Sequence, residues 1–136
     1  MDKVAKIVVV EDEELLLQVI SKKLTSLNYD VVSCKSAKQA LDYLKNLDKP
    51  ADAIWLDYYL EDMSGLDFLR EMKKDAKMAR IPVIVVSNSA SEDKKNAMLA
   101  LGAKRYILKA EHRLDEIVDT IQEIVEETKR NAQPAV

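Results

Sequence analysis

Five short apolar runs alternate along the chain with segments whose apolar residues recur at helical spacing. The runs predict strands, and they cover residues 6–10, 29–34, 53–57, 83–87 and 105–108. Each run leads into a predicted helix. Such strict alternation is typical of a parallel sheet with right-handed crossovers and helices on both faces. The sequence therefore predicts an α/β fold with a doubly wound, five-stranded parallel sheet and five helices.

The third run, Ala53–Asp57, is apolar until it ends abruptly on a carboxylate. A short continuous apolar run between polar residues is typical of a strand that is buried on both faces. Asp57 would then lie at the carboxyl end of a central strand, where open α/β sheets bind ligands. Taken alone, Asp57 would more simply be the first polar residue after a strand, so the other strand ends decide the interpretation.

Helix boundaries carry local signals of their own. The segments Ser36–Gln39, Ser64–Asp67 and Ser89–Glu92 have the pattern of a capping box, in which the serine hydroxyl accepts a hydrogen bond from an amide of the first turn. Asn28 and Gly102 follow predicted helices and suit the left-handed conformation that ends many helices. Each strand end is therefore expected to pass directly into a helix N-terminus.

Length and composition limit the classes of protein to consider. The 136 residues suit one domain, which we place at residues 1–128, followed by a flexible polar tail at 129–136. Acidic and basic residues are mixed, and the net charge of −3 gives no reason to expect nucleic-acid or membrane binding. A single cysteine and the lack of a membrane-length apolar run favour a cytoplasmic protein.

Polar residues with complementary chemistry follow four of the predicted strands. Glu11 and Asp12 follow the first, Asp57 ends the third, Ser87 ends the fourth and Lys109 follows the fifth. In the strand order 2-1-3-4-5, which is common for such sheets, these residues meet at one edge. Three carboxylates in a partly dry site repel one another, and a divalent cation together with Lys109 would balance their charge. Oxygen ligands with room for water suit Mg²⁺.

With such a cation present, Asp57 could act as a nucleophile toward a phosphoryl group. Ser87 and Lys109 could each bind a phosphoryl oxygen. Every residue also has an ordinary explanation, since Asp12 could cap the first helix and Ser87 and Lys109 could simply be polar residues after strands. Their joint occurrence, each at the appropriate strand end, favours the phosphoryl-transfer interpretation.

Motifs at these positions bring out a family resemblance. They are Val9–Glu13, Leu56-Asp57 with Met63–Leu66, Val85–Ser87, and Gly102-Ala103 through Tyr106 to Lys109. From about Lys3 to Thr128 the sequence resembles the receiver domain of bacterial two-component response regulators, whose fold is flavodoxin-like. The resemblance implies a signalling switch that catalyses only its own phosphorylation and dephosphorylation.

The resemblance also implies roles for individual residues. Asp57 would accept a phosphoryl group from a sensor histidine kinase or a phosphotransfer protein. Glu11 and Asp12, with Asp57 and the backbone carbonyl of Tyr59, would hold Mg²⁺, while Ser87 and Lys109 assist the transfer.

Ser87 and Tyr106 match the pair that couples phosphorylation to an output face in this family. That face would comprise the fourth helix, the fifth strand and the fifth helix, and it would bind a downstream protein. The domain is expected to be a monomer or a weak, phosphorylation-dependent dimer.

Three positions depart from the family pattern. Glu11 replaces the more usual Asp, Glu61 stands where proline is frequent, and Ala110 follows Lys109 where proline is usual. A cis bond before a non-proline residue costs about 2.5–4 kcal/mol, so we expect Lys109–Ala110 to be trans. We expect slow autodephosphorylation, because the bulky ring of Tyr59 beside the site would hinder the approach of the attacking water.

Two alternatives remain open. A receiver-like protein-binding module could act without phosphorylation, although the retained Asp57 and Lys109 argue against it. An enzyme or flavoprotein could use the same sheet. A flavin phosphate, however, would be repelled by the acidic segment 11–14, and phosphatases with an aspartate nucleophile carry a second Asp where this chain has Tyr59.

Overall fold

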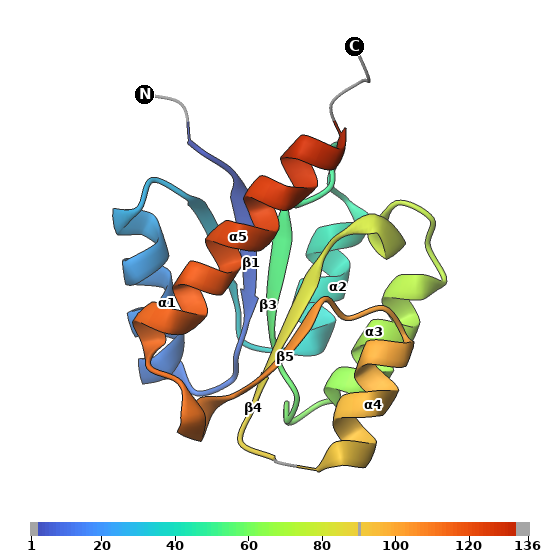
Figure 1. Cartoon of the computed structure of the whole chain (residues 1–136). Helices are drawn as coiled ribbons and strands as arrows, with labels where there is room; N and C mark the ends of the chain where they lie inside the picture. The colour runs from blue at the N-terminus through green and yellow to red at the C-terminus, as the bar shows by residue number, and fades with distance from the viewer. Residues whose placement is uncertain (1–2, 90, 133–136) are drawn as a thin grey trace.

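The structure is a computed structural model that describes residues 3–89 and 91–132. Strands and helices alternate as expected (Figure 1). They are β1 (Lys6–Val10), α1 (Glu14–Ser26), β2 (Asp30–Cys34), α2 (Ala37–Lys45), β3 (Ala53–Asp57), α3 (Gly65–Lys73), β4 (Val83–Ser87), α4 (Glu92–Ala100), β5 (Arg105–Leu108) and α5 (Leu114–Ala132), with short 3₁₀ turns η1 (Met78–Arg80) and η2 (Lys109–Glu111).

The five strands form one parallel sheet in the order β2-β1-β3-β4-β5, which confirms the predicted topology. The register pairs Val10 with Leu56 and Asp57 with Val86. The last residues of β1, β3 and β4 are therefore staggered by only one residue from each strand to the next. This register brings the predicted site residues to one edge.

Helices cover both faces of the sheet. Helices α1 and α5 lie on one face, and α2, α3 and α4 lie on the other (Figure 1). Every residue of β3 and β4 is buried, as expected for central strands. Side chains alternate along β3, so that Ile54 packs on the α2–α3 side while Trp55 packs on the α1–α5 side. The sheet is therefore packed between two apolar clusters, one on each face.

The capping patterns are confirmed for two helices and wrong for one. Ser36 and Ser64 each accept a hydrogen bond from the amide three residues on, at the starts of α2 and α3. Helix α4, however, is capped by Ser91, whose hydroxyl accepts from the amide of Lys94. The predicted cap, Ser89, is two residues too early, and the Ala90 of that pattern lies outside the described residues.

The predicted helix ends after α1 and α4 are confirmed. Asn28 has a φ of 70° and Gly102 a φ of 102°, both in the left-handed region. Helix α5 continues past residue 128 to Ala132, and the ammonium group of Lys129 donates a hydrogen bond to the carbonyl of Val4 at 2.6 Å. The domain boundary at residue 128 stays a prediction. The rest of the predicted tail, residues 133–136, lies outside the described part of the chain.

Helix α4 is the least firmly packed of the five. Met98 is its one buried side chain, whereas α2 and α3 each bury four residues. None of the described helices is long and apolar enough to cross a membrane.

Candidate functional site

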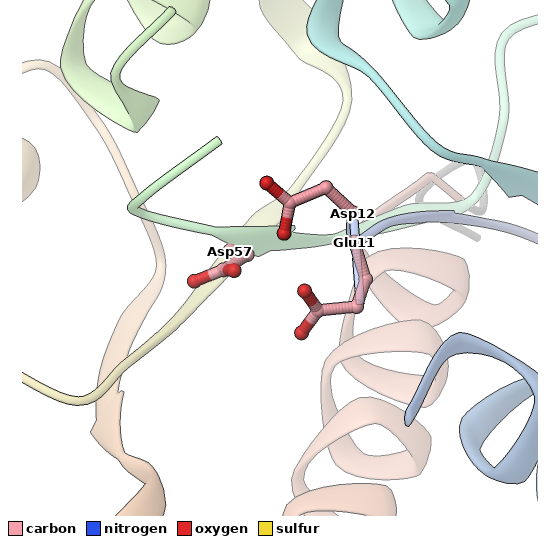
Figure 2. Close-up of side chains that lie close together, drawn as sticks. All are labelled: Glu11, Asp12 and Asp57. Carbon is pink, nitrogen blue, oxygen red and sulfur yellow. The ribbon is translucent and has the colours of Figure 1, made fainter. Parts of the chain in front are cut away.

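Three carboxylates meet at the carboxyl edge of the sheet. Glu11 and Asp12 directly follow β1, and Asp57 is the last residue of the adjacent strand β3. One carboxylate oxygen from each of the three residues lies within 4.8 Å of those from the other two. Figure 2 shows the three side chains projecting into the same space beyond the strand ends. The structure therefore brings together the acidic residues that the sequence singled out.

Burial makes this concentration of negative charge unfavourable. Glu11 is 1% exposed and Asp57 is 6% exposed. Burial, followed by the charge of Glu11, raises the pKa of Asp57 to about 7, although Lys109 acts in the opposite direction. Burial and the charge of Glu11 also raise the pKa of Asp12. The site therefore carries an excess of negative charge and is suited to binding a cation.

Lys109 supplies one positive charge. Its Nζ lies 3.0 Å from Oε1 of Glu11 and 3.7 Å from Oδ1 of Asp57. No peptide bond in the described ranges is cis, which confirms the trans bond expected between Lys109 and Ala110. The lysine thus reaches Asp57 through its side-chain conformation, as expected. That Glu11 is its nearer partner was not foreseen.

Ser87 and Tyr106 act on the same short loop, which joins β4 to α4. Ser87 is fully buried, and its hydroxyl accepts a hydrogen bond from the amide of Ser89 at 3.0 Å. The hydroxyl of Tyr106 donates to the carbonyl of Ser89 at 3.1 Å. The two residues of the predicted switch therefore hold the backbone of one residue, Ser89, from both sides.

The loop after β3 is tied to the acidic cluster. The amide of Tyr59 donates to Oδ1 of Asp57 at 3.3 Å, and the amide of Glu61 donates to Oδ2 of Asp12 at 3.1 Å. Gly65 lets α3 begin close to this loop, because a Cβ there would lie 3.0 Å from Cα of Tyr58. These contacts hold the loop in a defined position beside Asp57. The role of the Tyr59 carbonyl as a metal ligand stays a prediction.

Lys94, in the first turn of α4, is a residue near the site that the sequence reasoning missed. Its ammonium group bonds with the hydroxyl of Tyr59 and lies over the rings of Tyr58 and Tyr59. Its sequence position carried no signal, because a helix capped at Ser89, as the sequence predicts, would place Lys94 beyond the first turn.

Comparisons with known proteins agree with this geometry. Residues 7–122 match the family profile described as "Response regulator receiver domain". The chain belongs to this family. Among curated proteins, this receiver domain is 36% identical to the two-component response regulator ORR8 of Oryza sativa subsp. indica over 76% of the chain and 84% of that protein. It is 32% identical to the cell cycle transcriptional regulator CtrA of Caulobacter vibrioides, over 96% of the chain and 54% of CtrA.

Solved structures share the receiver fold. A CheY-like receiver domain from Methanospirillum hungatei has a TM-score of 0.85 at 23% identity and covers 97% of this chain and 100% of its own. The receiver domain of sensor histidine kinase PA1611 from Pseudomonas aeruginosa has a TM-score of 0.78 at 25% identity, covering 90% of this chain and 98% of its own. That structure has a magnesium ion coordinated in its active site cleft. Membership of the response regulator receiver family confirms the resemblance seen in the sequence.

The residues of this receiver domain fit Mg²⁺. The donor set consists of carboxylate oxygens close to one another, the hard ligands that Mg²⁺ prefers. The raised pKa of Asp57 shows that the cluster gains from added positive charge. Lys109 already offsets part of the charge, so a divalent ion would bring the three carboxylates close to balance.

Proposed function

We propose that this receiver domain is a phosphorylation-activated signalling switch that accepts a phosphoryl group on Asp57. The donor is a sensor histidine kinase or a phosphotransfer protein, and the reaction depends on Mg²⁺. The observation that carries the proposal is that Asp57 lies close to two further carboxylates and within 4 Å of the ammonium group of Lys109. Similarity to two-component response regulators supports it.

Each residue has a defined part in the proposed transfer. An oxygen of Asp57 forms a bond to phosphorus while the bond from phosphorus to the donor breaks, and the bonding electron pair leaves with the donor. Lys109 binds a phosphoryl oxygen by a charge-assisted hydrogen bond. Mg²⁺, held by Glu11, Asp12, Asp57 and the Tyr59 carbonyl, would supply the positive charge that lets two anionic groups approach.

The proposed switch begins at Ser87. When the buried hydroxyl of Ser87 turns to a phosphoryl oxygen, it no longer accepts the hydrogen bond from the amide of Ser89. The carbonyl of Ser89 is the partner of Tyr106, so this loop carries the change to β5 and to α4. The weak packing of α4 makes it the element most easily shifted. The output face formed by α4, β5 and α5 would then bind a downstream protein in the cytoplasm.

Phosphorylation is expected at Asp57 alone and only with Mg²⁺. The purified domain is incubated with acetyl phosphate, with Mg²⁺ or with EDTA, and its intact mass is measured. We expect the mass of one added phosphate with Mg²⁺, and none in EDTA or in Asp57→Asn. The exposed Asp42→Asn is the matched control and should be modified normally. An unmodified wild-type protein would favour the alternative, a protein-binding module that works without phosphorylation.

The switch is expected to be visible at Ser89 by NMR. Binding of beryllofluoride with Mg²⁺ should shift the Ser89 amide and resonances of α4 and β5, because the Ser87 hydroxyl leaves that amide. In Ser87→Ala the Ser89 amide should respond weakly, while residues next to Asp57 still respond. Unchanged Ser89 and α4 resonances in the wild-type protein would contradict this part of the proposal.

A further inference from the structure

The ammonium group of Lys94 connects α4 with both tyrosines that follow Asp57. It forms a hydrogen bond with the hydroxyl of Tyr59 and lies 4.7 Å from the centroid of the Tyr59 ring. It also lies 5.6 Å from the centroid of the Tyr58 ring. The two rings meet edge to face with centroids 5.0 Å apart. One cation and two aromatic rings therefore form a single cluster beside the phosphorylation site.

The helix itself gives no reason for a cation at this position. Lys94 is in the first turn of α4, where its amide bonds to the cap residue Ser91. The positive end of the helix dipole disfavours a cation there, whereas Glu92 and Asp93 in the same turn are favoured. Cation–π contacts and the tyrosine hydroxyl offset that disadvantage. The first turn of α4 is thus tied to the loop after β3 through Lys94.

The Tyr59 side chain extends from the site toward the β4–α4 loop. Its amide donates to Asp57 and its hydroxyl bonds to the ammonium group of Lys94, and Lys94, followed by Ser89, lowers the pKa of Tyr59. Since β3 and β4 are neighbouring strands, this side chain borders the site on its β4 side. Glu11 and Asp12 border it on the β1 side. Tyr59 is 48% exposed, so its contacts with Lys94 and with the Tyr58 ring are what hold the side chain in place.

We propose that Lys94 is a positioning residue that holds the Tyr59 ring over the β4 side of Asp57 and so slows hydrolysis of the phosphorylated aspartate. The inference rests on the proposed function. In hydrolysis, a water oxygen bonds to phosphorus as the bond from phosphorus to the Asp57 oxygen breaks. The carboxylate is regenerated, and both water protons stay on the released phosphate. When Lys94 holds the Tyr59 ring, the ring restricts the approach of that water to phosphorus. When the contact with Lys94 is lost, the ring can move and the water can approach.

The test measures the decay of the phosphorylated protein after the donor is removed. Lys94→Met keeps the aliphatic stem without the ammonium group, and Tyr59→Phe keeps the ring without the hydroxyl. Each should decay roughly three- to tenfold faster than the wild-type protein, the range that corresponds to the loss of one hydrogen bond. The double variant should decay no faster than either single variant, because both remove the same contact. Lys94→Arg, which keeps a cation and a donor, should restore slow decay.

Controls separate this inference from the function on which it rests. Lys95→Met makes the same charge change at the next residue of α4 and should decay at the wild-type rate. Thermal unfolding of each variant checks that it is folded. If Lys94→Met does not fold, the decay rate of Tyr59→Phe alone tests the inference. If the wild-type protein forms no phosphorylated species, the proposed function fails. If that species forms and Lys94→Met decays at the wild-type rate, or if the two single effects multiply, the role of Lys94 is overturned.

Discussion

Replacing Asp57 with Asn is expected to stabilise the folded protein by about 2–4 kcal/mol at pH 8 without Mg²⁺. The pKa of Asp57 is raised from 3.8 to about 7, first by burial and then by Glu11. The folded state therefore binds this proton more tightly than the unfolded state does. Above pH 7 the folded protein must hold a buried charge that the unfolded chain exposes to water, and Asn removes that cost.

The pH dependence follows from the same shift. As the pH falls from 7 toward 4, wild-type Asp57 becomes protonated in the folded state while it is still charged in the unfolded state. The advantage of the variant should therefore shrink through this range. Urea unfolding at pH 8, 6 and 5 measures the difference in the free energy of unfolding between Asp57→Asn and the wild-type protein. The exposed Asp42→Asn is a control that should leave the free energy of unfolding nearly unchanged. A variant that is less stable than the wild-type protein at pH 8 would contradict the prediction.

Replacing Lys109 with Met is expected to slow phosphorylation by acetyl phosphate by about 10²–10³-fold. The Lys109 ammonium lies within 4 Å of both Glu11 and Asp57, and no other described lysine or arginine forms an ion pair with either of them. Its removal leaves the transferring phosphoryl group without this preorganised cation. Met has a similar unbranched stem, so the packing around it is largely kept.

A second measurement shows that the metal site survives in this variant. Because Lys109 competes for the charge of Glu11 and Asp57, its loss should strengthen Mg²⁺ binding. Titration with Mg²⁺, followed through the fluorescence of the single tryptophan, Trp55, gives the dissociation constant. Replacing the exposed Lys104 with Met is the matched control, and it should leave both the rate of phosphorylation and the dissociation constant for Mg²⁺ unchanged. Phosphorylation of Lys109→Met at near the wild-type rate would show that the ammonium is dispensable.

Much of the architecture was determined by local sequence patterns. The apolar run Ala53–Asp57 coincides with β3, and the caps at Ser36 and Ser64 are formed as predicted. The physical reason is that burial pattern, capping and left-handed helix ends depend on residues within a few positions of one another. The common edge of a parallel sheet then places Glu11, Asp12 and Asp57 together, so the acidic site could be predicted as well.

Tertiary structure alone decided the finer choices. Both Ser89 and Ser91 could cap α4, but Ser87 and Tyr106 hold the backbone of Ser89 in the loop, so the helix begins after Ser91. Lys109 lies 98 residues from Glu11, and Lys94 lies 35 residues from Tyr59. Such pairs depend on where folding brings distant segments and on which side-chain conformation packing then allows. A local sequence pattern does not indicate which distant residues will come into contact. These contacts, unlike the sheet, therefore could not be predicted from the sequence.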